Sequence, residues 1–282
     1  MTTKTGKGVL EVYNMNTNIK NSRYFGAILI SPLIIVLLIG GVYLKIITFL
    51  LSIMGMYEVY KVINSGNKFN SIPIIGFALL ALYYLTGISI ETLGYMLIIS
   101  TLLLLCIPVI NLKYNFADMF LTLGVFIYVG VFLSLIPNIY DMQGGNYLIW
   151  LIFLSSWIGD TAAYYSGRFL GKHKLCPDVS PKKTVEGSIG GLIGSILSCG
   201  LFGIVTQGYL FHISLIHFFL MGALAGILGQ FGDLTASSIK RYFKVKDYSH
   251  LIPGHGGILD RFDSIIFSSV AIFMYLSLIL GL

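Results

Sequence analysis

Residues 92–110 read TLGYMLIISTLLLLCIPVI, an apolar run without a single charged side chain. A helix of about 20 mostly apolar residues is long enough to cross the hydrocarbon core of a bilayer. Comparable runs recur along the chain, at residues 25–44, 46–63, 72–90, 92–110, 117–137, 147–166, 188–207, 213–232 and 264–282. The sequence therefore predicts an all-α, polytopic integral membrane protein with about nine transmembrane helices.

The composition agrees with this fold class. Of the 282 residues 56% are hydrophobic and 11% are charged, whereas soluble domains carry about 25% charged residues. The formal net charge of +6 favours an anionic leaflet or anionic substrates, and we expect no nucleic-acid partner. The polar stretch before the first apolar run is not followed by a cleavage pattern, so we expect that run to remain as a membrane helix.

The basic residues predict the orientation. If the N-terminus is cytoplasmic and the nine runs alternate, all 18 Lys and Arg residues except Lys45 fall on the cytoplasmic side, as the positive-inside rule requires. We therefore expect a multi-pass protein of the cell (inner) membrane whose active site faces the cytoplasm. Its expected parts are a cytoplasmic leader at 1–24, N-terminal transmembrane helices at 25–137 and a C-terminal transmembrane catalytic region at 138–282.

Two long polar loops, residues 167–187 and 233–263, share that side. The second loop has four carboxylates, those of Asp233, Asp247, Asp260 and Asp263. Asp233 closes one predicted helix, and Asp260 and Asp263 stand three residues apart at the start of the next, on one face of a helical turn. Carboxylates at adjoining helix ends, without neighbouring His or Cys clusters, favour a hard cation such as Mg²⁺.

The same loop carries groups that suit a polyphosphate, namely Lys240, Arg241, Lys246 and Arg261. Arg grips phosphate with two donors and Lys acts as a point charge. Glycines on both sides of His255, Gly256 among them, allow backbone N–H groups to approach an anion. A solvated basic segment at the membrane surface would explain the cations but not the aspartates. His255 fits either a substrate contact or a loop histidine bonded to the backbone.

The first loop begins inside an apolar run. Asp160 lies near the cytoplasmic end of that run, where an ionised carboxylate must face a cavity, find a partner or reach the interface. Ser180 followed by proline predicts a helix N-cap, with Lys182 and Lys183 in the first helical turn. Lysines there oppose the helix dipole unless an anion is bound, which indicates phosphate binding.

Some features have a structural interpretation. Glycines at four-residue spacing within 187–194, and at 222 and 226, predict close helix packing. Glu58 and Asp118 each lie near a predicted membrane interface, and we expect both to be simple interfacial anchors.

With these residues the chain resembles the phosphatidate cytidylyltransferase (CDP-diacylglycerol synthase) family. The family signature is Ser-x-apolar-Lys-Arg, four residues, Lys-Asp, and then Pro-x-His-Gly-Gly-apolar-x-Asp-Arg-apolar-Asp. The residues that meet it are Ser237, Lys240, Arg241, Lys246, Asp247, Ser249, Ile252, Pro253, His255, Gly256, Gly257, Asp260, Arg261 and Asp263. The recognisable part runs from about Trp157 to Asp263, which we call the motif region; the earlier apolar runs match only as membrane helices.

The resemblance implies a helical membrane fold, a homodimer, and a polar cavity open to the cytoplasm. It implies Mg²⁺-dependent transfer of CMP from CTP to phosphatidic acid, with a metal centre at Asp233 and Asp260 that can also contain K⁺. The interpretations together assign catalysis to Asp233, Lys240, Arg241, Asp247, Asp260, Arg261 and Asp263. They assign substrate binding to Asp160, Ser180, Lys182, Lys183, Lys246, His255 and Gly256.

Two alternatives compete with this function. A CTP-dependent polyprenol or dolichol kinase would share the nucleotide and lipid chemistry but lack the full signature. An ion-coupled transporter could use Asp160 as its coupling carboxylate. Transporters, however, place such charges near the bilayer midplane between repeats, whereas these charges gather in two loops on one side.

Overall fold

The computed structural model describes residues 33–66, 68–210, 212–249 and 256–282 of the chain. Within these ranges six helical segments are long and apolar enough to cross a membrane: Gly41–Ser65, Ile90–Ile110, Phe116–Tyr140, Val185–Thr206, Leu215–Tyr242 and Leu259–Leu280. The helical membrane architecture is thereby confirmed at this coarser level. The predicted leader at 1–24 lies outside the described residues.

The predicted count of nine is not reached by the described helices. Helix α3 (Pro73–Leu85) has 13 residues, and α8 (Trp150–Leu170) is long enough but is not among the six. Of the first predicted run, residues 33–39 are described and helical. These three segments account for the difference between the expected and observed counts.

The first two apolar runs separate at Gly40, not near Lys45 as the sequence suggested. Gly40 and Gly41 have φ angles of +67° and +55°, which glycine adopts without steric cost. A Cβ atom on Gly40 would also lie 1.8 Å from the Tyr140 ring. Helix α2 (Gly41–Ser65) starts directly after this break, so Lys45 lies inside its first turns.

A continuous helical segment follows α4 (Ile90–Ile110). It consists of α5 (Phe116–Val125), the π-helical turn η1 (Phe126–Val131) and α6 (Phe132–Tyr140). We expected a turn at Pro137, but α6 continues through this proline. The same helix also spans residues 137 and 138, between which we expected the N-terminal helices to end and the catalytic region to begin. Membrane helices tolerate proline where neighbouring helices surround the broken hydrogen bond, and Pro137 is buried.

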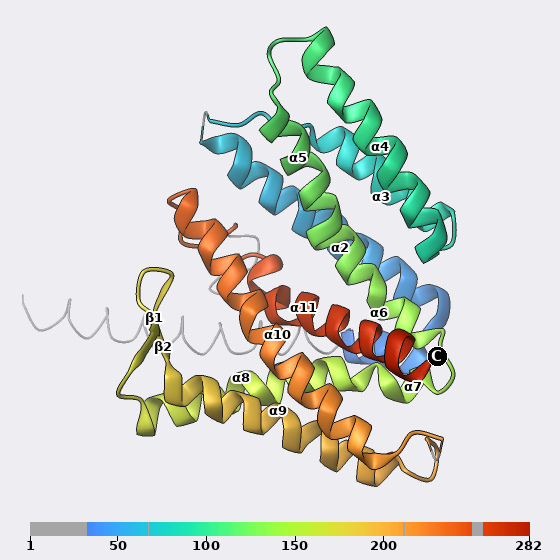
Figure 1. Ribbon diagram of the computed structural model, residues 1–282, viewed down its shortest axis with the longest axis vertical. Helices are drawn as coiled ribbons and strands as arrows, with labels where there is room; N and C mark the ends of the chain where they lie inside the picture. Colours follow the sequence, from blue (N-terminus) through green and yellow to red (C-terminus); the bar gives the residue numbers. More distant parts are fainter. Residues whose placement is uncertain (1–32, 67, 211, 250–255) are drawn as a thin grey trace, which may run out of the picture.

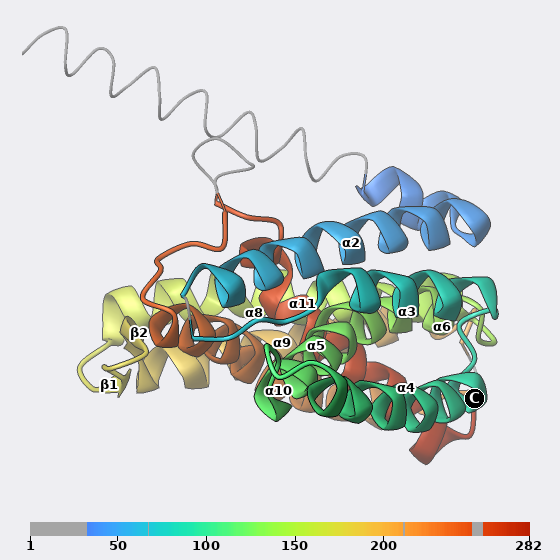
Figure 2. The same ribbon diagram turned by 90° about the horizontal axis from the view of Figure 1, so that it is seen from above.

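The C-terminal part begins with the short α7 (Gly145–Leu148) and α8. Helix α8 lies beside α9 (Val185–Thr206), and an antiparallel hairpin of β1 (Lys174–Cys176) and β2 (Ser180–Thr184) joins them (Figure 1). Helix α10 (Leu215–Tyr242) packs on α9 and on α11 (Leu259–Tyr275), which continues into η2 (Leu276–Leu280). The hairpin and the C-terminus lie at opposite ends of these helices (Figure 2).

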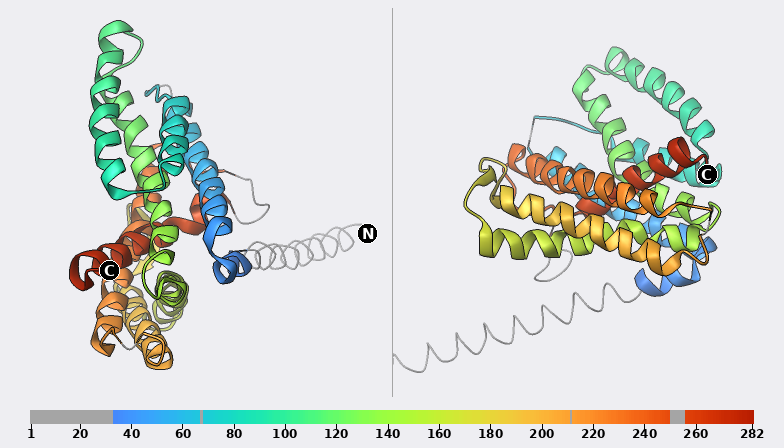
Figure 3. Two further views of the ribbon diagram at one scale, coloured as in Figure 1. Left: turned by 90° about the vertical axis from the view of Figure 1, so that its right-hand side faces the viewer. Right: turned by 60° about the horizontal axis from the view of Figure 1, so that its bottom comes forward.

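Glycines bring α8 and α9 into close contact, as their spacing predicted. A Cβ on Gly191 would lie 2.9 Å from that of Ala163, and one on Gly194 would lie 2.6 Å from that of Ala162. On α10, a Cβ on Gly222 would lie 2.6 Å from the Ser195 carbonyl oxygen of α9. The side-by-side course of α8 and α9 is visible in Figure 3.

Two contacts join helix ends that are far apart in the sequence. Lys45 forms an ion pair with Asp141 at 2.8 Å, and Lys68 Nζ donates to Tyr242 Oη at 2.6 Å. In the topology predicted from the sequence, Lys45 and Asp141 lie on the non-cytoplasmic side of the membrane. Lys68 and Tyr242 lie on the cytoplasmic side. The two contacts agree with that alternation. Helix α6 packs against both α2 and α11 and so joins the N-terminal helices to the C-terminal ones.

Candidate active site

A cavity of about 360 Å³ lies where α8 ends, beside the hairpin and the start of α9. The lining comes from α8, the hairpin, α9 and α10, and it consists of Asp160, Ala163, Tyr164, Gly167, Arg168, Leu175, Lys182, Lys183, Thr184, Gly187, Ser188, Gln230 and Asp233. Four predicted site residues, Asp160, Lys182, Lys183 and Asp233, are thus brought together. The volume falls in the range of about 300–1,000 Å³ that is usual for small-molecule sites.

The hairpin corrects one local expectation. Ser180 begins strand β2 and is not a helix N-cap. The cap of α9 is Thr184, whose Oγ1 accepts a hydrogen bond from the Gly187 N–H at 3.1 Å. Lys182 and Lys183 therefore precede the helix, and the argument from lysines in its first turn is wrong. Proline is accommodated after Ser180 because a two-stranded ribbon has free edges.

Asp233 corrects a second expectation, since it lies inside α10 and does not end it. Its Oδ2 atom forms an ion pair with Lys183 Nζ at 2.5 Å. Next to it, Gly232 allows α11 to come close: a Cβ there would lie 2.4 Å from the Asp263 carbonyl oxygen. Asp160 and Asp233 both interact electrostatically with the Asp263 carboxylate. Three helices thus contribute one carboxylate each to the same region.

Asp260 lies in a second, more enclosed arrangement. It belongs to the first turn of α11, which confirms the helical turn expected for Asp260 and Asp263. Its Oδ1 accepts from Lys240 Nζ at 2.6 Å, and its Oδ2 accepts from the N–H groups of Tyr248 and Gly257 at 3.1 and 2.9 Å. The Lys240 ammonium also lies 5.4 Å from the centre of the Tyr248 ring, within cation–π range.

Tyr248 is part of the same enclosed arrangement. Its hydroxyl donates to the Ala236 carbonyl oxygen at 3.1 Å. Burial raises the pKa of the Tyr248 phenol well above its usual range, because the phenolate would lose its hydration. The phenol therefore acts as a neutral hydrogen-bond donor that fixes the chain after α10.

The other predicted residues lie around these groups. The Arg241 guanidinium is exposed and donates to the carbonyl oxygens of Val179 and Val245 at 3.3 and 3.5 Å, so it links the hairpin to the end of α10. Lys246 and Arg261 are exposed and Asp247 is half-buried. Gly256 has a φ of +82°, which confirms that this position needs glycine. His255 lies outside the described residues.

The carboxylates allow a test of whether Mg²⁺ fits. Within the described ranges no group of three or more His, Cys, Asp or Glu side chains is close enough to hold a metal. Asp233 and Asp260 form ion pairs with two different lysines, Lys183 and Lys240 respectively. Mg²⁺, however, needs only one or two carboxylates and takes its other ligands from water and phosphate. The donor set is compatible with such an ion.

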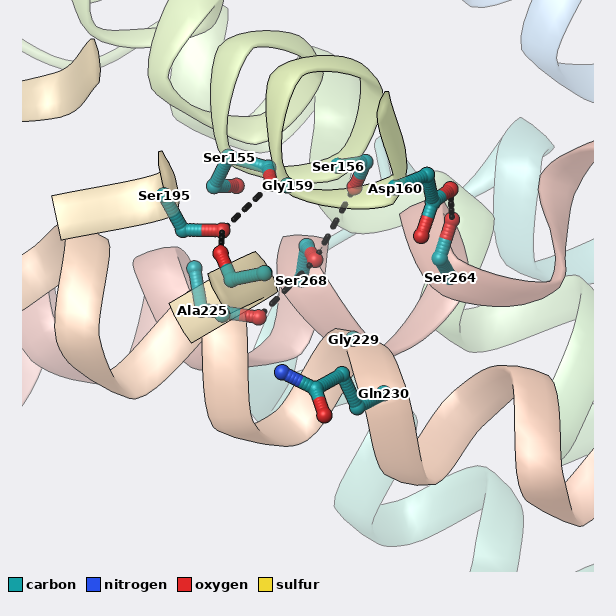
Figure 4. Close-up of a pocket in the computed structure, with 12 residues that line it drawn as sticks. Ser155, Ser156, Gly159, Asp160, Ser195, Ala225, Gly229, Gln230, Ser264 and Ser268 are labelled. Atoms are coloured by element: carbon teal, nitrogen blue, oxygen red, sulfur yellow. Dashed lines mark hydrogen bonds between the residues drawn. The ribbon is translucent and has the colours of Figure 1, made fainter. Parts of the chain in front are cut away.

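A small polar pocket of about 10 Å³ lies behind Asp160, between α8, α9, α10 and α11 (Figure 4). Ser264 Oγ donates to Asp160 Oδ2 at 3.2 Å, and Ser156 Oγ donates to Ser268 Oγ at 3.1 Å. Ser195 Oγ donates to the Ser155 carbonyl oxygen at 2.7 Å. The space corresponds to about one water molecule. These serines tie α8 to α9 and α11 beside the Asp160 carboxylate.

Two carboxylates were misjudged from the sequence. Glu58 and Asp118 are fully buried, so the expectation that they are interfacial anchors is wrong. Asp118 forms a capping box with Asn115 at the start of α5 and accepts from the Asn70 N–H at 2.7 Å. The Asn-x-x-Asp spacing could have revealed this cap. Glu58 contacts residues about 200 positions later in the chain, which no local pattern indicates.

Comparison with known proteins decides the family. The model of the cytidylyltransferase family matches residues 21–279. Phosphatidate cytidylyltransferase of Staphylococcus saprophyticus is 37% identical over 239 residues, which cover 82% of this chain and 89% of that protein. The proteins of the same name from Staphylococcus haemolyticus and Staphylococcus aureus are 36% and 33% identical, with the same coverage. This chain belongs to the cytidylyltransferase family.

The family resemblance predicted from the motif region is therefore confirmed, and the chain is a nucleotidyltransferase. The match also extends beyond the motifs, because it includes the helices before Trp157 that the sequence related to the family only as membrane spans. Family membership argues against the ion-coupled transporter. In this cytidylyltransferase six of the predicted site residues lie in two places: Asp160, Lys182, Lys183 and Asp233 line the cavity beside the hairpin, and Lys240 and Asp260 form the enclosed pair.

Proposed function

We propose that this cytidylyltransferase transfers CMP from CTP to phosphatidic acid, giving CDP-diacylglycerol and pyrophosphate in phospholipid biosynthesis. The observation that carries the proposal is the cavity of about 360 Å³ in which basic and acidic motif residues meet. The relatives named phosphatidate cytidylyltransferase, which share up to 37% of the aligned residues, support the choice of substrates.

The chemistry suits the residues around the cavity. A phosphatidate oxygen attacks the α-phosphorus of CTP, and the bond between that phosphorus and the bridging oxygen of pyrophosphate breaks. The nucleophile is already anionic, so no general base is needed, and catalysis consists of alignment and charge neutralisation. Arg168, Lys182 and Lys183 line the cavity and supply positive charge for the phosphates. Lys183 can exchange Asp233 for a phosphate oxygen because both side chains are partly exposed.

We propose that the cofactor is Mg²⁺, with K⁺ as a second ion. The family resemblance implies that Asp233 and Asp260 are the protein ligands. When bound, the ion neutralises negative charge on the phosphates. Asp233 lines the cavity and Asp260 holds Lys240, so ion binding at Asp260 requires Lys240 to share or release that carboxylate.

We also propose that the protein is a homodimer of the cell membrane, with the cavity open to the cytoplasm that supplies CTP. The distribution of Lys and Arg supports this orientation. Single cysteines placed at Ser180 and Asn146 in a cysteine-free background test it. A membrane-impermeant maleimide added to intact cells should label the cysteine at position 146 and spare the one at position 180. The reverse pattern would contradict the orientation.

Purified protein in phosphatidate-containing liposomes tests the activity. With CTP and Mg²⁺ it should form CDP-diacylglycerol and pyrophosphate in equal amounts. A lipid kinase would release CDP, and formation of CDP without CDP-diacylglycerol would favour that alternative.

A further inference from the structure

Glu58 connects the N-terminal helices to the motif region. It lies on α2, is fully buried, and directs its carboxylate oxygens at Ser249 and at the start of α11. Its Oε1 accepts from Ser249 Oγ at 2.5 Å and from the Ile258 N–H at 2.9 Å, and its Oε2 accepts from the Leu259 N–H at 2.9 Å. One side chain thus holds residues on both sides of the stretch 250–255.

Gly257 gives Glu58 the room to make these contacts. A Cβ atom at this position would lie 2.6 and 2.7 Å from the two carboxylate oxygens of Glu58. Real Cβ atoms do not approach oxygen so closely, and buried backbone leaves little room to move away. A side chain at position 257 would therefore displace the Glu58 carboxylate from these contacts.

The carboxylates of Glu58 and Asp260 both accept hydrogen bonds from backbone N–H groups at the start of α11. The N–H of Gly257 donates to Asp260, and those of Ile258 and Leu259 donate to Glu58. The first N–H groups of a helix lack partners within the helix and carry its positive dipole end. Two carboxylates therefore bind three consecutive amides, and the same turn fixes the Asp260 side chain that holds Lys240.

We propose that Glu58 is a positioning residue for cytidylyl transfer: it fixes the first turn of α11 so that Asp260 and Lys240 keep the arrangement needed for reaction. This inference rests on the proposed function. Glu58 acts through the backbone and contacts no substrate. Its loss should therefore lower kcat more than it raises KM, because misplaced reacting groups slow chemistry without removing binding contacts.

Glu58→Gln tests the proposal at constant side-chain volume. Both oxygens of Glu58 accept hydrogen bonds, so the amide NH₂ of glutamine would face a donor in either orientation. In liposomes, with full-length protein, we expect kcat to fall about 10- to 100-fold while KM for CTP changes less than kcat. Glu58→Asp keeps the charge but is one methylene shorter, so its kcat should lie between those of Glu58→Gln and the wild type.

Asp118→Asn is the matched control. Asp118 is also a fully buried carboxylate of the N-terminal helices that accepts backbone N–H groups, those of Asn70 and Asn115 at 2.7 and 2.9 Å. It should lower the melting temperature but leave kcat and KM per folded molecule close to wild type. The melting temperature of each variant is measured in the same detergent.

The outcomes separate the two proposals. A wild-type protein that makes no CDP-diacylglycerol from CTP and phosphatidate contradicts the proposed function. If the wild type is active, a wild-type kcat in Glu58→Gln overturns the role of Glu58. If Glu58→Gln does not fold, a wild-type kcat in Glu58→Asp overturns it. An equal loss of kcat in Asp118→Asn also overturns it, because buried carboxylates would then act only through general stability.

Discussion

The cytidylyltransferase contains two Lys–Asp pairs of nearly equal length in different surroundings. Lys183 and Asp233 lie 2.5 Å apart at the cavity, with 26% and 31% of their side chains exposed. Lys240 and Asp260 lie 2.6 Å apart with 11% and 8% exposed, and backbone N–H groups complete the second pair. The comparison indicates that the first pair can exchange partners with substrate more readily than the second, whose backbone contacts also hold the motif region together.

Removing the enclosed lysine should have the largest effect on stability. Lys240→Ala leaves the Asp260 carboxylate buried without its cation, and breaking a buried pair in this way costs about 3–5 kcal/mol of unfolding free energy. Denaturant unfolding in detergent, or the melting temperature where unfolding is irreversible, measures the loss. A change below about 1 kcal/mol would mean that the pair is not part of the folded framework.

Changing the cavity aspartate should affect activity more than stability. Asp233→Asn removes a charge that orients Lys183 and is a proposed ligand for Mg²⁺. We expect turnover to fall roughly 10²- to 10³-fold, as when one preorganised charge-stabilising group is removed. The melting temperature should stay close to that of the wild type. Wild-type turnover would remove Asp233 from the site, and a collapse in melting temperature would make the two pairs alike.

The cavity lysine should show the smallest effect on stability. Lys183→Ala breaks a partly exposed ion pair, which contributes about 0–1 kcal/mol, while KM for CTP rises because a phosphate contact is lost. The control is Lys244→Ala, since Lys244 is exposed and lies outside the family signature. It should leave turnover unchanged and stability within about 0.5 kcal/mol. Equal rises in KM for both variants would indicate only a general effect of positive charge.

Local patterns in the sequence predicted the membrane architecture and four of the residues that line the cavity. Apolar length predicts helices, glycine spacing predicts the packing of α8 on α9, and the motif residues Asp160, Lys182, Lys183 and Asp233 do line one cavity. Family membership followed from the signature alone. These features depend on short stretches of chain, which explains why they could be predicted.

The errors have both local and distant causes. Ser180 resembled a helix cap, but the chain forms a hairpin there and Thr184 caps α9. Asp233 resembled a helix end because polar residues follow it, yet α10 continues to Tyr242. Glu58 resembled an anchor because its partners belong to the start of α11, about 200 residues away. Contacts distant in the sequence determine the position of Glu58, and residue spacing carries no signal for them.

The fate of labelled CTP tests the central claim most directly. Purified protein in phosphatidate liposomes is given CTP labelled with ³²P at either the α or the γ position, and the lipid is then extracted. Attack at the α-phosphorus predicts that the α label enters the lipid and the γ label is released as pyrophosphate. The rate at which α label enters the lipid should fall roughly 10²- to 10³-fold in Asp233→Asn and stay at the wild-type level in Lys244→Ala. A γ label in the lipid would contradict cytidylyl transfer and identify the protein as a CTP-dependent lipid kinase.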